Sequence, residues 1–185
     1  MRVDDEIVSN YRASRAAFLR DDIEEAERYY RANRLLGTDL YYEVELPHDL
    51  LLVHPIGTVL GRANYGNWLV VYHGCGVGSD IHRNRPTLGD GVVLFPGAKV
   101  LGRSVIGKNV YITANTVVND MEVPDNVVVF PHSVVVGPGD MRGSFVITAV
   151  EQQPSWKHTN RSVLTDFFSG PRQPSPESLA MLGAV

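Results

Sequence analysis

The stretch LGDGVVLFPGAKVLGRSVIGKNVYITANTVV, residues 88–118, decides the fold, because a large apolar residue recurs in it at every sixth position. Extended to residue 136, the series holds nine positions, and all but one of them carry a large apolar side chain. Its members are Leu88, Leu94, Val100, Ile106, Ile112, Val118, Pro124, Phe130 and Val136. A helix repeats about every 3.6 residues and a simple strand about every two, so a period of six indicates a solenoid of short flat faces.

Three such faces make one triangular coil of about 18 residues, with the leading aliphatic side chain pointing inward. Four positions after the leaders from Leu88 to Phe130, where two faces meet, all but one of the residues are small or β-branched, and Gly89, Gly107 and Gly137 fit the turns. Followed backwards, the register reaches Val70, Leu52, Leu46 and Leu40, and it weakens between residues 58 and 87. The sequence therefore predicts a β-solenoid over residues 39–137.

Residues 1–38 precede the solenoid, and their pattern predicts two short helices between residues 4 and 36. Ile7, Tyr11 and Phe18 share one face of the first helix. Asp21 or Asp22 can cap the second helix, and Gly37 can end it. Because these apolar stripes are thin, we expect the two helices to pack on the solenoid.

Residues 138–171 form a predicted C-terminal extension, with a strand over residues 144–150 and a helical turn or two over residues 162–168. Residues 172–185 are rich in proline, serine and small side chains, which predicts a flexible tail.

Composition excludes several classes of partner. The 185 residues carry a formal net charge of -4, which argues against nucleic acid or an anionic membrane as the main partner. Cys75 is the single cysteine, so an intrachain disulfide is ruled out and a reducing compartment is expected. The acidic start is unlike a secretory signal, and the sequence lacks an apolar run long enough for a transmembrane helix. We expect a soluble, cytoplasmic protein.

Within the solenoid, the motif HPIGTVLG over residues 54–61 resembles H-x-x-G-x-V-x-G of the serine O-acetyltransferases, which are hexapeptide-repeat acyltransferases. Asp39 lies fifteen positions before His54, as an aspartate does in that family, and residues 91–102 resemble its coenzyme A segment. The match runs from about residue 39 to residue 133. It implies a left-handed β-helix, acetyl-CoA as co-substrate, no metal, a role in cysteine biosynthesis, and a homotrimer with sites between subunits.

The resemblance assigns catalysis to His54 and Asp39. Transfer of acetyl from a thioester to a hydroxyl requires a base, and an imidazole titrates near working pH. A carboxylate on its other ring nitrogen would fix the tautomer and stabilise the imidazolium. The resemblance further implies that a polar loop with His82, Arg83 and Arg85 contributes charge to acceptor binding.

Other site residues follow from spacing and from the family. Tyr72 lies three hexads after His54, so a regular coil would stack it on His54 at the border of the acceptor pocket. Lys99 and Lys108 are typical of solvated surface rather than of phosphate binding. The resemblance places the arm of coenzyme A along Gly78, Pro96, Gly97, Ala98, Thr113 and Ala114.

The chain also departs from that family. Val53 precedes His54, where the family has an aspartate that contacts the substrate amino group, and the segment before Asp39 is shorter than the family's helical domain. Serine, another hydroxylated small molecule and a sugar therefore all remain as acceptors. Two other functions stay open: a zinc enzyme like the γ-carbonic anhydrases, whose histidine spacing is not matched here, and a scaffold or regulatory subunit without catalysis.

Overall fold

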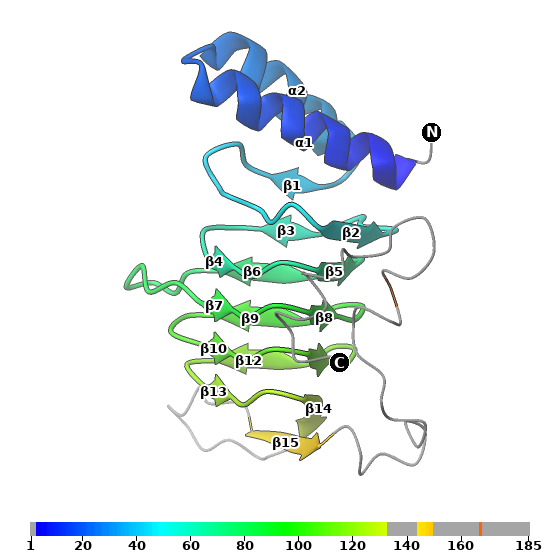
Figure 1. Ribbon diagram of the computed structural model, residues 1–185, viewed down its shortest axis with the longest axis vertical. Helices are drawn as coiled ribbons and strands as arrows, with labels where there is room; N and C mark the ends of the chain where they lie inside the picture. The colour runs from blue at the N-terminus through cyan, green and yellow to red at the C-terminus, as the bar shows by residue number, and fades with distance from the viewer. Residues whose placement is uncertain (1–2, 133–143, 150–166, 168–185) are drawn as a thin grey trace, which may run out of the picture.

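The computed structural model describes residues 3–132, 144–149 and 167, and it shows a three-sided prism of stacked coils below a helical hairpin (Figure 1). The complete coils contribute one short strand to each of three sheets, which are parallel apart from one antiparallel strand at the end of the second sheet. The prism is the predicted left-handed β-helix.

Sheet A has the order β1-β3-β6-β9-β12. Its strands are Asp39–Leu40, Val59–Leu60, Gly76–Gly78, Lys99–Leu101 and Val117–Asn119. Sheet B has the order β15-β14-β11-β8-β5-β2. In chain order its strands are Leu50–Val53, Leu69–Tyr72, Val92–Leu94, Val110–Ile112, Val127–His132 and Ser144–Ala149. Sheet C has the order β13-β10-β7-β4, with strands Asn64–Tyr65, Thr87–Leu88, Val105–Ile106 and Glu122–Val123.

The six-residue register is confirmed between residues 88 and 118. Leu88 pairs with Ile106, Leu94 with Ile112, and Val100 with Val118, so each of these coils is three full hexads long. All six side chains are buried in the central core. Burying each aliphatic side chain contributes about 1.5–3 kcal/mol of transfer free energy, which makes this column the main stabilising element of the prism.

The predicted register is wrong after Val118. Ile106 pairs with Val123 and Ile112 with Val129, so these coils are one residue shorter than three hexads, and Val123 and Val129 point inward. Pro124 is therefore exposed and Phe130 lies on the outer face of sheet B. Val136 lies outside the described residues.

The register also differs on the N-terminal side. Leu40, Leu46 and Leu52 are buried in the core as predicted, but Val70 is not a core leader. Its neighbour Val71 pairs with Leu52 and with Leu94 and points inward, while Val70 belongs to a second cluster on the outer face of sheet B. The coil from Leu52 to Val71 is one residue longer than three hexads, which a strict period of six does not anticipate.

Gly89 and Gly107 serve close packing rather than a left-handed turn. Neither has a positive φ. A Cβ on Gly89 would lie 2.7 Å from the carbonyl oxygen of Gly107, and one on Gly107 would lie 2.7 Å from the backbone nitrogen of Asp125. The successive turns therefore touch through their backbones, and glycine is required because it has no side chain.

The two predicted helices are confirmed as α1 (Val3–Leu19) and α2 (Ile23–Leu35). The Asp22 side chain accepts a hydrogen bond from the backbone N–H of Glu25, so it is the N-cap, and Gly37 follows the helix with a φ of 82°.

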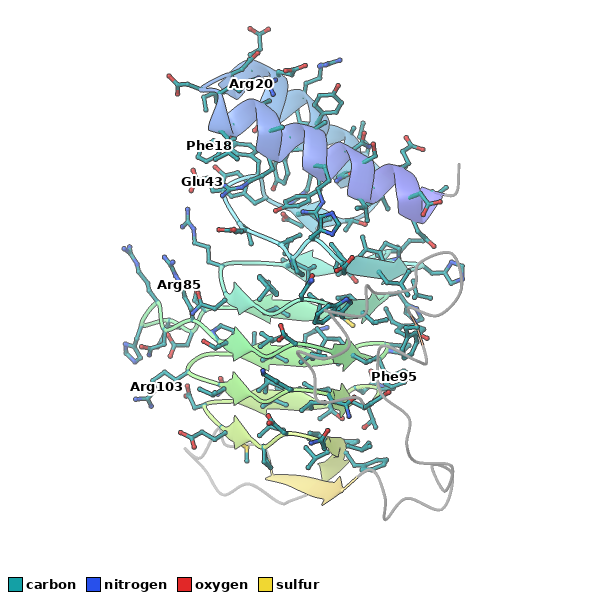
Figure 2. The ribbon with its side chains drawn as sticks, in the orientation of Figure 1. Phe18, Arg20, Glu43, Arg85, Phe95 and Arg103 are labelled. Carbon is teal, nitrogen blue, oxygen red and sulfur yellow. The ribbon has the colours of Figure 1, made fainter. Side chains whose placement is uncertain are left out.

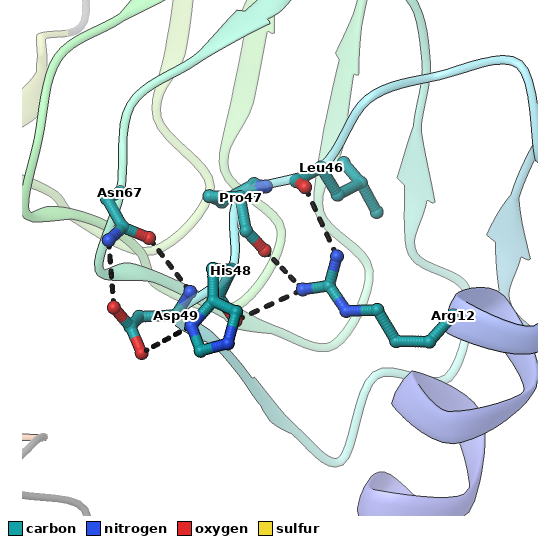
Figure 3. A network of polar contacts seen from close by, with 6 residues as sticks. All are labelled: Arg12, Leu46, Pro47, His48, Asp49 and Asn67. Atoms are coloured by element: carbon teal, nitrogen blue, oxygen red, sulfur yellow. Dashed lines mark hydrogen bonds and ion pairs between the residues drawn. The ribbon is translucent and has the colours of Figure 1, made fainter. Parts of the chain in front are cut away.

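Helix α1 fastens the hairpin to the first coil (Figure 3). The Arg12 guanidinium donates to the carbonyl oxygens of Leu46, Pro47 and His48. The buried Tyr11 hydroxyl donates to the Val44 carbonyl at 2.6 Å and accepts from the Leu46 N–H at 2.8 Å. These bonds satisfy the backbone polar groups of a segment that has no ladder partner of its own.

In the C-terminal part, β15 falls on the predicted strand over residues 144–150. The predicted helical turn over residues 162–168 lies outside the described residues except for Phe167, which is helical and packs against the outer cluster of sheet B. The predicted tail over residues 172–185 also lies outside them.

Candidate functional site

The candidate base His54 lies on the edge of the prism where sheet B turns into sheet A. We call this line the His54 edge, and in successive coils it consists of residues 54–58, 73–75, 96–98 and 114–116. The His54 side chain is exposed, and its backbone has a φ of 49°. A left-handed φ in a residue other than glycine is uncommon, and such conformations gather at functional sites.

Tyr72 does not stack on His54, so that prediction is wrong. The parallel register pairs Tyr72 with Val53. The residues that follow them, His73 and His54, are therefore the ones that lie next to each other in neighbouring coils. The cause is the longer coil between Leu52 and Val71, which displaces the expected alignment by one position. Tyr72 thus lies beside the His54 edge, on the outer face of sheet B, where its ring stacks on Phe95.

Asp39 lies one coil away from His54. The Asp39 N–H donates to the Thr58 carbonyl at 2.9 Å, and the Gly57 N–H donates to the Gly37 carbonyl at 2.8 Å, so the two turns are bonded together. The carboxylate, however, accepts hydrogen bonds from the Tyr30 hydroxyl at 3.1 Å and from the Arg34 guanidinium. Among the described residues it makes no hydrogen bond to the His54 ring.

Helix α2 therefore contributes two residues to the site that sequence reasoning missed. Tyr30 and Arg34 are four residues apart on one helical face, directly before the turn to Asp39. This spacing is the feature of the sequence from which the pair could have been found. Burial, followed by the negative charge of Asp39, raises the pKa of Tyr30, so its hydroxyl stays protonated and donates. The charge of Asp39 also raises the pKa of the exposed Arg34.

The predicted substrate loop lies on a different edge, where sheet A turns into sheet C. We call this line the loop edge; it consists of residues 61–63, 79–86, 102–104 and 120–121. His82, Arg83 and Arg85 are exposed, and the loop projects from the prism between β6 and β7 (Figure 1). Arg85 and Phe95 lie on opposite sides of the molecule (Figure 2). A single chain thus does not bring this loop to His54.

The loop is organised around Asp80. Its carboxylate accepts hydrogen bonds from the N–H groups of His82 and Asn84 at 2.8 and 2.9 Å and from the Asn84 side chain at 2.7 Å. The bond from the Asn84 side chain is the main cause that lowers the pKa of Asp80. These hydrogen bonds hold the backbone of the turn in one conformation, from which the exposed side chains of His82, Arg83 and Arg85 extend.

Most of the predicted coenzyme A positions lie along the His54 edge. Pro96, Gly97 and Ala98 are two coils from His54, and Thr113 and Ala114 are three coils away. Gly78 is apart from them, at the opposite end of a sheet A strand. The N–H groups of Gly97 and Ala98 already donate to the carbonyl oxygens of His73 and Phe95, so these two donors are engaged.

Lys99 is not the solvated side chain that its sequence suggests. It is half-buried, and its ammonium donates to the carbonyl oxygens of Gly74 and Gly97 on the His54 edge. Its chain passes over Gly76, where an added Cβ would lie 2.7 Å from Lys99 Cδ. Cys75 is a small core residue buried between these turns, and burial raises the pKa of its thiol.

The described part of the chain contains neither a candidate metal site nor a candidate membrane span. Among its residues, no group of three or more His, Cys, Asp or Glu side chains is close enough to hold a metal ion. In the same residues, no helix is both long and apolar enough to cross a membrane.

The repeats of this chain match known proteins. The family model "Bacterial transferase hexapeptide (six repeats)" matches residues 85–120. The serine acetyltransferase of Synechococcus elongatus is 34% identical over 110 residues, covering 57% of this chain and 45% of that protein. The one from Mycobacterium tuberculosis is 36% identical over 107 residues, covering 56% and 47%. This chain thus spans about half the length of the curated relatives it matches.

Solved structures agree with the sequence comparison. The crystal structure of Neisseria gonorrhoeae serine acetyltransferase in complex with serine superposes with a TM-score of 0.61 at 29% identity, covering 71% of this chain and 55% of that chain. The expected resemblance is confirmed: over its repeats this chain is similar to the serine acetyltransferases, and it shares their hexapeptide-repeat β-helix.

Proposed function

We propose that this chain is an acetyl-CoA-dependent O-acetyltransferase that acts on the hydroxyl of serine or a related small molecule. The observation that carries the proposal is the exposed His54 on an edge of a β-helix whose relatives are serine acetyltransferases. Several proposed coenzyme A positions lie along the same edge, which supports a common cleft for both reactants.

In the proposed mechanism, His54 removes the proton from the acceptor hydroxyl as its oxygen attacks the thioester carbon. The tetrahedral intermediate then collapses, the C–S bond breaks, and the imidazolium returns the proton to the leaving thiolate. Asp39 would orient the ring and stabilise its charged form. Its two oxygens offer about four acceptor sites, so bonds from Tyr30 and Arg34 still leave room for the imidazole N–H.

Acetyl-CoA would lie along the His54 edge, over Pro96–Ala98 and Thr113–Ala114. Because Pro96 has no N–H and the Gly97 and Ala98 donors are engaged, contacts there would rely on other polar groups and on shape. The positive charge for acceptor binding would come from the loop edge of a second copy, where His82, Arg83 and Arg85 are exposed. A homotrimer with sites between subunits would satisfy this geometry.

The direct test measures free thiol released from acetyl-CoA by the full chain, with amino acids and sugars as acceptors. Acceptor-dependent release together with a trimeric mass by light scattering is expected. A lack of release with every acceptor would favour a non-catalytic scaffold, and a monomeric mass in an active sample would contradict the shared site.

A further inference from the structure

A second histidine lies on the His54 edge, and the acetyl transfer proposed above does not use it. Because Val53 pairs with Tyr72, His73 occupies in its coil the place that His54 occupies in the neighbouring coil. Adjacent strands of a sheet are about 4.8 Å apart, so the two residues are close neighbours. Both imidazoles are exposed, and the His73 ring makes no hydrogen bond to any described residue.

The backbone that carries His73 is bonded to both neighbouring coils. Its carbonyl oxygen accepts a hydrogen bond from the Gly97 N–H at 3.0 Å. The next residue, Gly74, has a φ of 64°, and its N–H donates to the Ile56 carbonyl oxygen at 2.9 Å. The Gly74 carbonyl oxygen in turn accepts from the Lys99 ammonium. A turn held in this way suits exact placement of the His73 side chain.

The order of residues along the edge places His73 between the proposed base and the proposed coenzyme A positions. His54 is in the first coil of the edge, His73 in the second, and Pro96–Ala98 and Thr113–Ala114 are in the third and fourth. A reacting acceptor oxygen lies within about 3.2 Å of its base and about 3–3.5 Å from the carbon that it attacks. The thioester carbonyl is therefore expected beside the second coil.

Attack on that carbonyl places negative charge on its oxygen, and hydrogen-bond donors are needed to stabilise the charge. Most backbone N–H groups of the His54 edge already donate to oxygen atoms of this chain. They are those of Ile56, Gly57, Thr58, Gly74, Cys75, Gly97, Ala98, Asn115 and Thr116. Pro55 and Pro96 have no N–H. The backbone of this edge thus has few donors left for an oxyanion.

Most side-chain donors near the thioester are engaged as well. The Thr58 hydroxyl and the Cys75 thiol donate to backbone carbonyl oxygens, and two further carbonyl oxygens hold the Lys99 ammonium. Asn115 is exposed, but it lies in the fourth coil, about 10 Å from the second by strand spacing. Among the described residues of this edge, the His73 ring is the unengaged side-chain donor in the coil next to the base.

We propose that His73 is a second catalytic residue, whose ring N–H donates a hydrogen bond to the oxyanion of the tetrahedral intermediate. This inference rests on the proposed acetyl transfer and deepens it. The acceptor oxygen bonds to the acetyl carbon, and the π electron pair of the carbonyl moves onto its oxygen, which the His73 N–H stabilises. The carbonyl then re-forms, the C–S bond breaks, and the thiolate takes the proton from the His54 imidazolium. His73 itself transfers no proton.

The experiment measures thiol release from acetyl-CoA by the full chain, with L-serine, L-homoserine and methyl glucoside as acceptors. His73→Ala should lower kcat by about a hundredfold and change the KM for acetyl-CoA by less than about threefold. His73→Gln keeps an N–H donor and should restore kcat to within about tenfold of wild type. His48→Ala is the matched control, because this exposed histidine lies at the opposite end of β2, and kcat should not change.

A dithioacetyl analogue of acetyl-CoA separates oxyanion stabilisation from a structural role. Sulfur in place of the carbonyl oxygen is a weak hydrogen-bond acceptor, so the His73 donor should contribute little to this reaction. The ratio of kcat with acetyl-CoA to kcat with the analogue should therefore fall by about tenfold in His73→Ala. Melting temperature and coenzyme A affinity should match those of wild type in both His73 variants.

Three results would overturn the role of His73 and leave the acetyltransferase proposal standing. They are wild-type turnover in His73→Ala, an unchanged ratio between the two co-substrates, and a His73→Gln variant as slow as His73→Ala. A wild-type chain that releases thiol with none of the three acceptors would instead overturn the proposed function itself.

Discussion

The two edges of the prism that border sheet A differ in backbone and in charge. Along the His54 edge the turns are short, each is hydrogen-bonded to the next, and the segments contain no Asp, Glu, Lys or Arg. Along the loop edge, one coil is interrupted by residues 79–86, and Arg62, Arg83, Arg85 and Arg103 accumulate there. The rigid edge suits exact placement of a base, while the charged edge suits contact with a second chain or a ligand.

The largest effect is expected on kcat, when one histidine from each edge is replaced by alanine. His54→Ala should lower kcat by at least about a hundredfold while coenzyme A binding survives, because the proposed base is lost. His82→Ala on the loop edge should change kcat by less than about threefold and act on the acceptor KM instead. Steady-state kinetics on both variants measures the contrast. Unchanged turnover in His54→Ala would remove the proposed base.

The next effect concerns the backbone of the two edges. Gly97 has a φ of 77°, and a Cβ there would lie 2.3 Å from the Asn115 side-chain oxygen, so Gly97→Ala should destabilise the fold by about 2 kcal/mol. A Cβ on Gly78, beside the loop edge, meets no atom within 4 Å, so Gly78→Ala should stay within about 0.5 kcal/mol of wild type. Denaturant unfolding of the pair tests this difference, and equal losses would contradict it.

A smaller effect is expected from the loop cations. Arg83→Ala combined with Arg85→Ala should raise the acceptor KM by about tenfold, because these groups would donate charge-assisted hydrogen bonds across the subunit interface. Thermal stability should not change, since both side chains are exposed. Arg20→Ala, at the helical end of the molecule, is the control (Figure 2). An unaltered KM in the double variant would show that the loop edge takes no part in acceptor binding.

The smallest effect is on Cys75, inside the His54 edge. Burial raises the pKa of its thiol, so at a given pH less thiolate is present than in an exposed cysteine. Alkylation of the native protein at pH 8 should be more than about tenfold slower than in denaturant, and it should accelerate as the pH rises further. Equal rates in both states would mean that this edge opens readily.

The sequence predicts the repeating part of the fold because side-chain burial there follows a fixed period. It fails where a coil is one residue shorter or longer than three hexads, as at Val123 and at Tyr72, because such a change leaves the local composition unaltered. The motif around His54 could be recognised because it is local. The bonds from Tyr30 and Arg34 to Asp39 could not, since they depend on how a helix docks onto the first coil.

Strand β15 has a consequence for association. A parallel solenoid ends in strands whose backbone groups are free to pair with another chain, which is a route to fibres. Here β15 runs antiparallel to β14 and occupies that terminal position in sheet B, while the helical hairpin covers the opposite end of the stack. Copies of the molecule are thereby discouraged from joining end to end through this sheet, and lateral contacts remain the available mode of assembly.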